Sequence, residues 1–112
     1  MGGLPPIFFL ALALPALAPT ATVAADPGSG RAKAAACALC HGQLGISTLP
    51  NAPHLAGQPA IYVEEQLKGY RSGTRRHEVM NVVAKPLSDA DIADLAAWFA
   101  SITVEATAPR AE

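Results

Sequence analysis

The sequence contains few charges, few aromatic side chains and only two cysteines. Eight basic and nine acidic residues among 112 give a formal net charge of −1, which excludes a nucleic-acid binder or a strongly acidic tail. Phe8 and Phe9 lie near the N-terminus, so the aromatic side chains from residue 26 onward are Tyr62, Tyr70, Trp98 and Phe99. So few large side chains make a thin core for a small domain.

The shortage of cysteine limits the chemistry open to Cys37 and Cys40. A zinc ribbon needs a second pair of cysteines or histidines at matching spacing, and the sequence offers only the isolated His54 and His77. A redox-active dithiol is typical of a strand–helix context, whereas the segment before Cys37 is rich in alanine. A disulfide would use both thiols, but none of these three interpretations explains the histidine that follows them.

That histidine completes the motif Cys37-Ala38-Leu39-Cys40-His41. Two cysteines separated by two residues and followed by histidine form the attachment site of a c-type haem. Each thiol adds across a haem vinyl group to give a thioether, and His41 supplies an imidazole nitrogen as the proximal iron ligand. The motif therefore predicts one haem c, bound covalently through Cys37 and Cys40.

The N-terminal residues lack Lys and Arg, and residues 4–17 are apolar and uncharged. This run is followed by the small residues Val23-Ala24-Ala25, a cleavage pattern before Asp26. Prolines interrupt the run, and it is too short for a membrane span. We predict a signal peptide over residues 1–25, export to the periplasm and a single domain over residues 26–112. An uncleaved anchor is the alternative, because only the α-amino group supplies positive charge before the apolar run.

Helix signals divide the predicted domain into short helices and long loops. After a polar lead over residues 26–30, the alanine-rich residues 31–38 predict a first helix that runs into the haem motif. Pro59 suits the first position of a second helix, which Gly73 ends. Residues 42–58 and 74–86 are expected as loops.

Ser88 begins the most clearly marked helix. Asp91 follows three residues later and forms a capping box with Ser88. The expected buried face consists of Ile92, Leu95, Ala96, Phe99 and Ile102, and residues 103–112 are expected as a frayed tail. The sequence thus predicts an all-α fold of three to four short helices, whose long loops wrap around one haem.

Met80 is the best candidate for the second axial ligand of the iron. It follows His41 by 39 positions in the second loop and, apart from the initiator, it is the only methionine. A thioether suits iron and raises the reduction potential. His77 and His54 are the rival ligands, although both are expected at the surface. For the second ring nitrogen of His41, the Pro53 carbonyl is an attractive acceptor, because proline keeps a carbonyl and lacks an N–H donor.

The ordered set of motifs resembles the class I monohaem c-type cytochromes, in particular the bacterial cytochrome c-553 subgroup and its two-domain relatives. The likeness runs from Gly30 to Ile102 and rests on these segments: Cys37 to Gly42, Pro50 to Gln58, Tyr62 with Gln66-Leu67, Tyr70 to Gly73, Met80, Leu87 to Ile92, and Leu95 to Phe99. The resemblance implies that His41 and Met80 are the axial ligands and that the Pro53 carbonyl accepts from His41. It also implies that the first and last helices cross near Gly30 and Trp98, and that Arg75 or Arg76 pairs with a haem propionate. Trp98 stands where tyrosine is common, and this difference is expected to change packing only.

These features predict a soluble electron carrier rather than an enzyme. A six-coordinate iron without a general acid or base favours one-electron outer-sphere transfer to and from redox partner proteins: a donor dehydrogenase or cytochrome complex, and an acceptor oxidase or reductase. No nucleic-acid partner and no stable membrane insertion after signal removal are expected.

Two alternatives stay open: a haem subunit of a dehydrogenase, and a five-coordinate gas-binding cytochrome if Met80 is not a ligand. A basic rim could steer an acidic partner or be a solvated mixed surface; it comprises Lys68, Arg71, Arg75, Arg76 and Lys85.

The thin core predicts that removal of the haem unfolds the protein. Covering ~400 Å² of apolar haem surface contributes on the order of 10 kcal/mol, comparable to the whole net stability of a domain. Far-ultraviolet circular dichroism of haem-free protein during heating is expected to show little helix and no cooperative transition. A sharp thermal transition in that protein would contradict the prediction.

Overall fold

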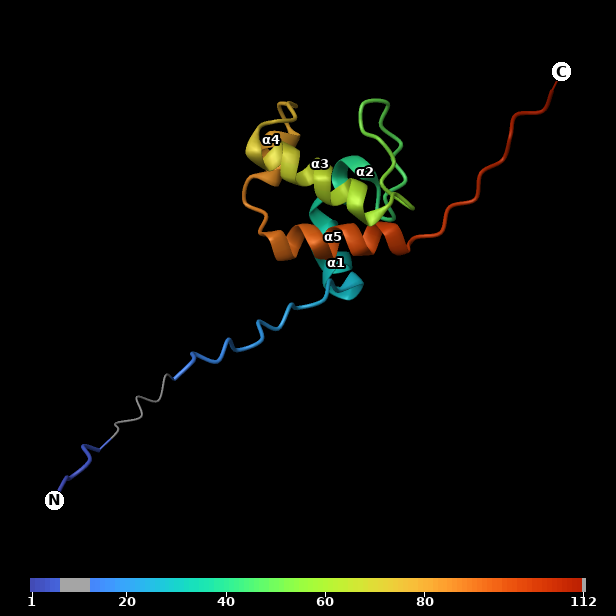
Figure 1. The fold of residues 1–112 in the computed structure, drawn as a ribbon. Helices are drawn as coiled ribbons and strands as arrows, with labels where there is room; N and C mark the ends of the chain where they lie inside the picture. Colours follow the sequence, from blue (N-terminus) through green and yellow to red (C-terminus); the bar gives the residue numbers. More distant parts are fainter. Residues whose placement is uncertain (7–12, 112) are drawn as a thin grey trace.

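The computed structural model describes residues 1–6 and 13–111, and within these residues every regular element is helical (Figure 1). The elements are α1 (Pro27–Lys33), the 3₁₀ helix η1 (Ala34–Ala36), α2 (Ala38–His41), α3 (Ala60–Ser72), α4 (Met80–Ala84) and α5 (Asp89–Ser101). The all-α prediction is confirmed, with more helices than the three or four expected. Part of the predicted signal peptide, residues 7–12 with Phe8 and Phe9, lies outside the described residues. None of the described helices is long and apolar enough to cross a membrane.

The first helix begins earlier than the sequence predicted. Residues 26–30 were expected as a polar lead, but α1 begins at Pro27, with Asp26 as its N-cap. The Asp26 carboxylate accepts hydrogen bonds from the N–H groups of Gly28 and Ser29, at 2.9 and 3.2 Å. A capping carboxylate followed by proline at the first helical position is a strong start signal, and here it outweighs the low helix propensity of the two glycines that follow.

Gly30 lies where α1 crosses α5. A Cβ atom at this position would lie 2.0 Å from the carbonyl oxygen of Asp94 and 2.8 Å from Cβ of Trp98. Only glycine permits this approach, since the contacting atoms belong to the backbone and to the base of a side chain. The expected crossing of the first and last helices near Gly30 and Trp98 is therefore present in the structure.

The chain from η1 to α2 carries the haem motif across this crossing. Ala34 of η1 packs in the buried core with Leu95 and Phe99 of α5. Gly42, with φ 79°, ends α2, and a Cβ there would lie 2.0 Å from the carbonyl oxygen of Ile46. Residues 42–58 contain no helix, as predicted.

The helix α3 ends as expected, at Gly73 in the left-handed conformation with φ 85°. Pro59 is its N-cap rather than its first helical residue. The following segment differs from the prediction, because residues 74–86 were expected as a loop but contain α4. Its valines are β-branched and weak helix formers, so the local sequence gives little helix signal. Burial of Ala84, which is fully inaccessible, holds this short helix in place.

The last long helix, α5, forms as predicted. The Ser88 hydroxyl accepts from the Asp91 N–H at 3.0 Å and the Asp91 carboxylate accepts from the Ser88 N–H at 2.9 Å, which completes the capping box. The hydrogen bond from the Ser88 N–H, followed by the one from Lys33, lowers the pKa of Asp91 to about 2. The predicted buried face is confirmed for Ile92, Leu95, Ala96 and Phe99, whereas Ile102 is the half-buried C-cap.

We expect Gly30→Ala to lower the free energy of unfolding of the haem-loaded protein by about 3 kcal/mol, because the added methyl group forces α1 away from α5. Chemical denaturation measures the effect. Gly28→Ala is the matched control: it lies in the same helix, its added Cβ meets only the Asp26 side chain, at 3.3 Å, and stability is expected to stay within about 1 kcal/mol. Equal stability of the two variants would contradict the prediction.

Candidate functional site

One helical turn brings together the three reactive side chains of the motif. Cys37 is the N-cap of α2, and its carbonyl accepts from the N–H groups of Cys40 and His41 at 3.3 and 2.9 Å. The Cys37 side chain is half-buried against the core, and that of Cys40 is exposed. Cys37 and Cys40 are not joined by a disulfide. Residues three and four apart lie on the same side of a helix, so the turn presents two thiols and an imidazole to one side.

Burial raises the pKa of the Cys37 thiol. A catalytic dithiol needs the opposite shift, because the thiolate is the nucleophile. This environment does not favour the redox-dithiol interpretation. Within the described part of the chain, no group of three or more His, Cys, Asp or Glu side chains is placed to hold a metal ion.

The His41 ring is oriented by the carbonyl of Pro53. His41 is only 8% exposed, and its Nδ1 lies 2.8 Å from the Pro53 oxygen. A carbonyl only accepts, so Nδ1 carries the proton and Nε2 keeps its lone pair. No hydrogen bond to Nε2 occurs among the residues that the structure describes. The imidazole is therefore held with Nε2 available to a metal. Two thiols for covalent attachment and one nitrogen ligand are the groups that a haem c needs.

Met80 is the first residue of α4 and is half-buried. In Figure 1, α4 and α2 lie on the same side of α5, with α3 between them in this view. Met80 and His41 thus belong to two different helices, α4 and α2, on the same side of α5.

Each of the two rival histidines contacts backbone N–H groups of the loop in which it lies. His54 is exposed, and its Nδ1 accepts from the Ser47 N–H at 2.8 Å. His77 is also exposed, and its Nδ1 lies 3.3 Å from the backbone nitrogens of Val79 and Met80. Their expected surface positions are confirmed, and in each ring one nitrogen is engaged by the backbone.

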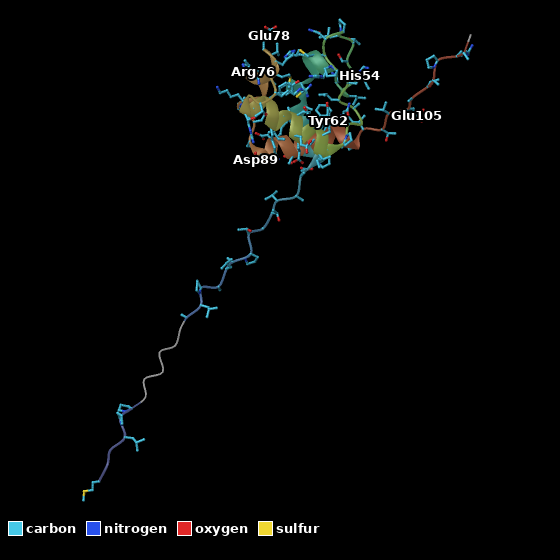
Figure 2. All side chains as sticks on the ribbon, turned by 45° about the horizontal axis from the view of Figure 1, so that its top comes forward. His54, Tyr62, Arg76, Glu78, Asp89 and Glu105 are labelled. Atoms are coloured by element: carbon cyan, nitrogen blue, oxygen red, sulfur yellow. The ribbon has the colours of Figure 1, made fainter. Side chains whose placement is uncertain are left out.

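Some side chains of the basic rim form ion pairs or hydrogen bonds within the domain, and others face a groove. Arg71 is 2.6 Å from Asp89, and Lys68 is 3.3 Å from Glu64. Arg75 bonds to Gln66 at 2.5 Å, and its guanidinium lies 4.7 Å from the centre of the Tyr70 ring. Arg76 and Lys85 line an open groove of about 590 Å³ beside α4, and Arg71 lines it as well. Figure 2 shows Arg76 near Glu78, apart from His54.

Asn81 is a structural element of the site that the sequence did not reveal. Its amide nitrogen donates to the carbonyls of Tyr70 and Arg75, at 2.7 and 2.8 Å. Its amide oxygen accepts from the His77 N–H at 2.7 Å. This one side chain therefore ties the end of α3 to the loop before Met80. In the sequence, the only sign of this role is the position of Asn81 next to the candidate ligand Met80. Such a neighbour is too common to be interpreted alone.

The comparisons with known proteins show the family to which the chain belongs. The model of the family described as cytochrome c matches residues 25–103. Cytochrome c4 from Pseudomonas aeruginosa is 46% identical over 81 residues, which cover 72% of this chain and 40% of that protein. Cytochrome c-554(548) from Halomonas halodenitrificans is 42% identical over 81 residues, which cover 70% of this chain and 98% of that protein. Both relatives carry names other than c-553, so membership of the c-553 subgroup is not confirmed.

A solved structure also supports membership of the cytochrome c family. The crystal structure of reduced recombinant cytochrome c4 from Pseudomonas stutzeri superimposes with a TM-score of 0.68 at 38% identity, over 71% of this chain and 47% of that one. A protein from Thiomonas intermedia named thiosulfate dehydrogenase electron acceptor is 39% identical over 87 residues, covering 76% of this chain and 37% of that protein. The chain spans less than half the length of these longer relatives.

We expect Asn81→Ala to lower the free energy of unfolding of the haem-loaded protein by about 1–2 kcal/mol, since it removes the three side-chain hydrogen bonds to Tyr70, Arg75 and His77. Chemical denaturation followed by circular dichroism tests this. Asn51→Ala, at an exposed loop position, is the control and is expected to leave stability unchanged. A cost at position 81 no larger than at position 51 would show that the bridge contributes nothing.

Proposed function

Because the chain belongs to the cytochrome c family and is an electron-transfer protein with covalently bound haem c, we propose that it carries single electrons between redox proteins by outer-sphere transfer through an iron ligated by His41 and Met80. The hydrogen bond from His41 Nδ1 to the Pro53 carbonyl, at 2.8 Å, is the observation that carries this proposal. It fixes the imidazole orientation and leaves Nε2 for the iron. The haem, when bound, supplies an iron that alternates between two oxidation states.

The residues of the motif set where electrons enter and leave. Cys37 faces the core and Cys40 faces solvent, so attachment through both thiols holds one edge of the group at the surface. Leu39, between them, is 88% exposed and marks the surface that a partner approaches. Burial of His41 limits water access on the proximal side.

Met80 is proposed as the second ligand, which closes the coordination sphere. A soft thioether opposite an imidazole raises the reduction potential and leaves no open position for a gas or peroxide. The hydrogen bonds of Asn81 to Tyr70 and Arg75 support the segment that presents Met80. We assign the propionate contact to Arg75 or Arg76; Arg75 is already held by Gln66.

Transfer within a dehydrogenase complex is the second candidate function. A relative named thiosulfate dehydrogenase electron acceptor favours it. The two functions differ in partner affinity: a complex subunit co-purifies with a catalytic partner through gel filtration, whereas a free carrier elutes alone. For either function, the protein is proposed to act in the periplasm, with residues 1–25 removed as a signal peptide and residues 26–112 forming one domain.

Met80→Ala tests the ligand assignment. The substitution is expected to abolish the weak far-red sulfur-to-iron absorption band of the oxidised protein and to lower the reduction potential. It is also expected to allow the reduced protein to bind carbon monoxide at neutral pH. Absorption spectra and a potentiometric titration measure these changes.

His77→Ala and His54→Ala are the matched controls, because they remove the rival ligands. Both are expected to keep the far-red band. An unchanged potential in Met80→Ala, or loss of the band in a histidine variant instead, would assign the sixth position to another residue.

A further inference from the structure

The folded part of the chain begins at Asp26, directly after the small residues Val23-Ala24-Ala25. Residues 13–25 are exposed and belong to no helix, and Figure 1 shows them running away from the helices. Asp26, in contrast, is anchored by its backbone and its side chain. Its carbonyl accepts from the Gly30 N–H at 2.9 Å, in addition to the capping bonds to its carboxylate. The boundary between unstructured and helical chain thus coincides with the proposed cleavage site.

The nitrogen of Asp26 makes a contact across the fold. Its N–H donates to Asp94 Oδ1 at 2.8 Å, linking residues 68 positions apart. Asp94 lies in α5, and its other carboxylate oxygen is 2.6 Å from Lys33 Nζ of α1. The Asp94 side chain is only 14% exposed, so solvent screens this contact less than an ordinary surface pair.

We propose that removal of residues 1–25 turns this hydrogen bond into an ion pair between a new α-ammonium group on Asp26 and the carboxylate of Asp94, so that export processing strengthens the attachment of α1 to α5. Hydrolysis adds one water across the Ala25–Asp26 peptide bond. Ala25 leaves with a carboxylate, and the Asp26 nitrogen takes up protons to become an ammonium group. The inference rests on the proposed export of the protein.

The charges around this position favour an added cation. Lys33 also lies 3.0 Å from Asp91, so Lys33, Asp91 and Asp94 together carry one excess negative charge. The hydrogen bond from the Asp26 N–H, followed by that from Lys33, holds the pKa of Asp94 below its usual value, which keeps the carboxylate charged at neutral pH. The N-terminal end of the α1 dipole opposes a cation, but the Asp26 carboxylate lies at the same end.

A double-mutant cycle on haem-loaded protein tests the ion pair. One version starts at Asp26 and the other retains Ala24 and Ala25, and each is made with and without Asp94→Asn. Asp94→Asn removes the Lys33 contact in both versions, so only the difference between them reports on the ammonium group. We expect Asp94→Asn to reduce the folding equilibrium constant about threefold more in the version that starts at Asp26. Equal effects in the two versions would overturn the proposal.

Asp91→Asn is the matched control, because Asp91 contacts Lys33 but has no hydrogen bond to Asp26. Its effect is expected to be the same in both versions. A larger effect of Asp91→Asn in the version starting at Asp26 would mean that general charge, not the Asp94 contact, links the N-terminus to stability, and would also overturn the proposal.

The pH dependence identifies the group that titrates. An α-amino group ordinarily has a pKa of about 7.7–8.0, and pairing with Asp94 raises it in the folded protein. The added stability is therefore present below about pH 8 and is lost as the pH rises through the raised pKa. The facing groups, Asp26, Lys33, Asp91 and Asp94, keep their charges in this range. A difference between the two versions that does not change up to pH 10 (about two units above the ordinary value) would contradict the assignment.

The mass of the exported haem protein tests the processing step. We expect a polypeptide that starts at Asp26. Since the haem spectrum reports separately on electron transfer, a coloured protein with residues 1–25 retained, or one that starts elsewhere, would overturn this inference and the proposed cleavage site but not the proposed electron transfer.

Discussion

The approach of α1 to α5 at Gly30 is the constraint on which the remaining structure depends. Pro27 to His41 form one nearly continuous run of helical turns, so the crossing sets where the thiols and the imidazole lie. The same helix also holds the loop that orients the imidazole, because the Phe99 carbonyl accepts from the Gly57 N–H at 2.8 Å. His41 and Pro53 thus reach each other from two segments that share α5 as their support. A shift of α1 along α5 would separate them, which is why a backbone contact far from the motif governs the geometry of the ligand.

Local chemistry made much of this fold and site predictable from the sequence. The capping box at Ser88, the stop at Gly73 and the cysteine–histidine motif each depend on residues within a few positions of one another. The sequence offered the Pro53 carbonyl as an acceptor for His41, since proline keeps a carbonyl and lacks a donor, but it did not distinguish this role from that of an ordinary loop proline. The start of α1 was not predicted, although Asp26 and Pro27 carry a local signal. Gly28 and Gly30 oppose a helix by propensity, and the reason for Gly30 is visible only when α5 lies against it.

The features that escaped prediction depend on contacts between distant segments. Asn81 serves the site through two carbonyls of a preceding helix and loop, which no spacing in the sequence reveals. The short helix α4 follows from the burial of Ala84, and its valines give no helical signal of their own. Trp98 was expected to alter packing alone. Its indole N–H is buried without a hydrogen-bond partner among the described residues, which is an unfavourable arrangement.

Some Lys and Arg side chains of the basic rim are paired within the domain and others are not, and this difference affects how a partner would be recognised. A basic rim was suggested by five residues, Lys68, Arg71, Arg75, Arg76 and Lys85, yet Lys68 and Arg71 form ion pairs within the domain. Charges engaged in this way contribute little to a long-range field, and the formal net charge of −1 adds no strong attraction of its own. Steering toward an acidic partner is therefore weak, and short-range contact must contribute more to recognition. The exposed apolar side chain of Leu39, next to the solvent-facing thiol of Cys40, offers such contact at the edge where an electron would pass. Under the proposed function, the motif that attaches the cofactor also presents the surface through which it exchanges electrons.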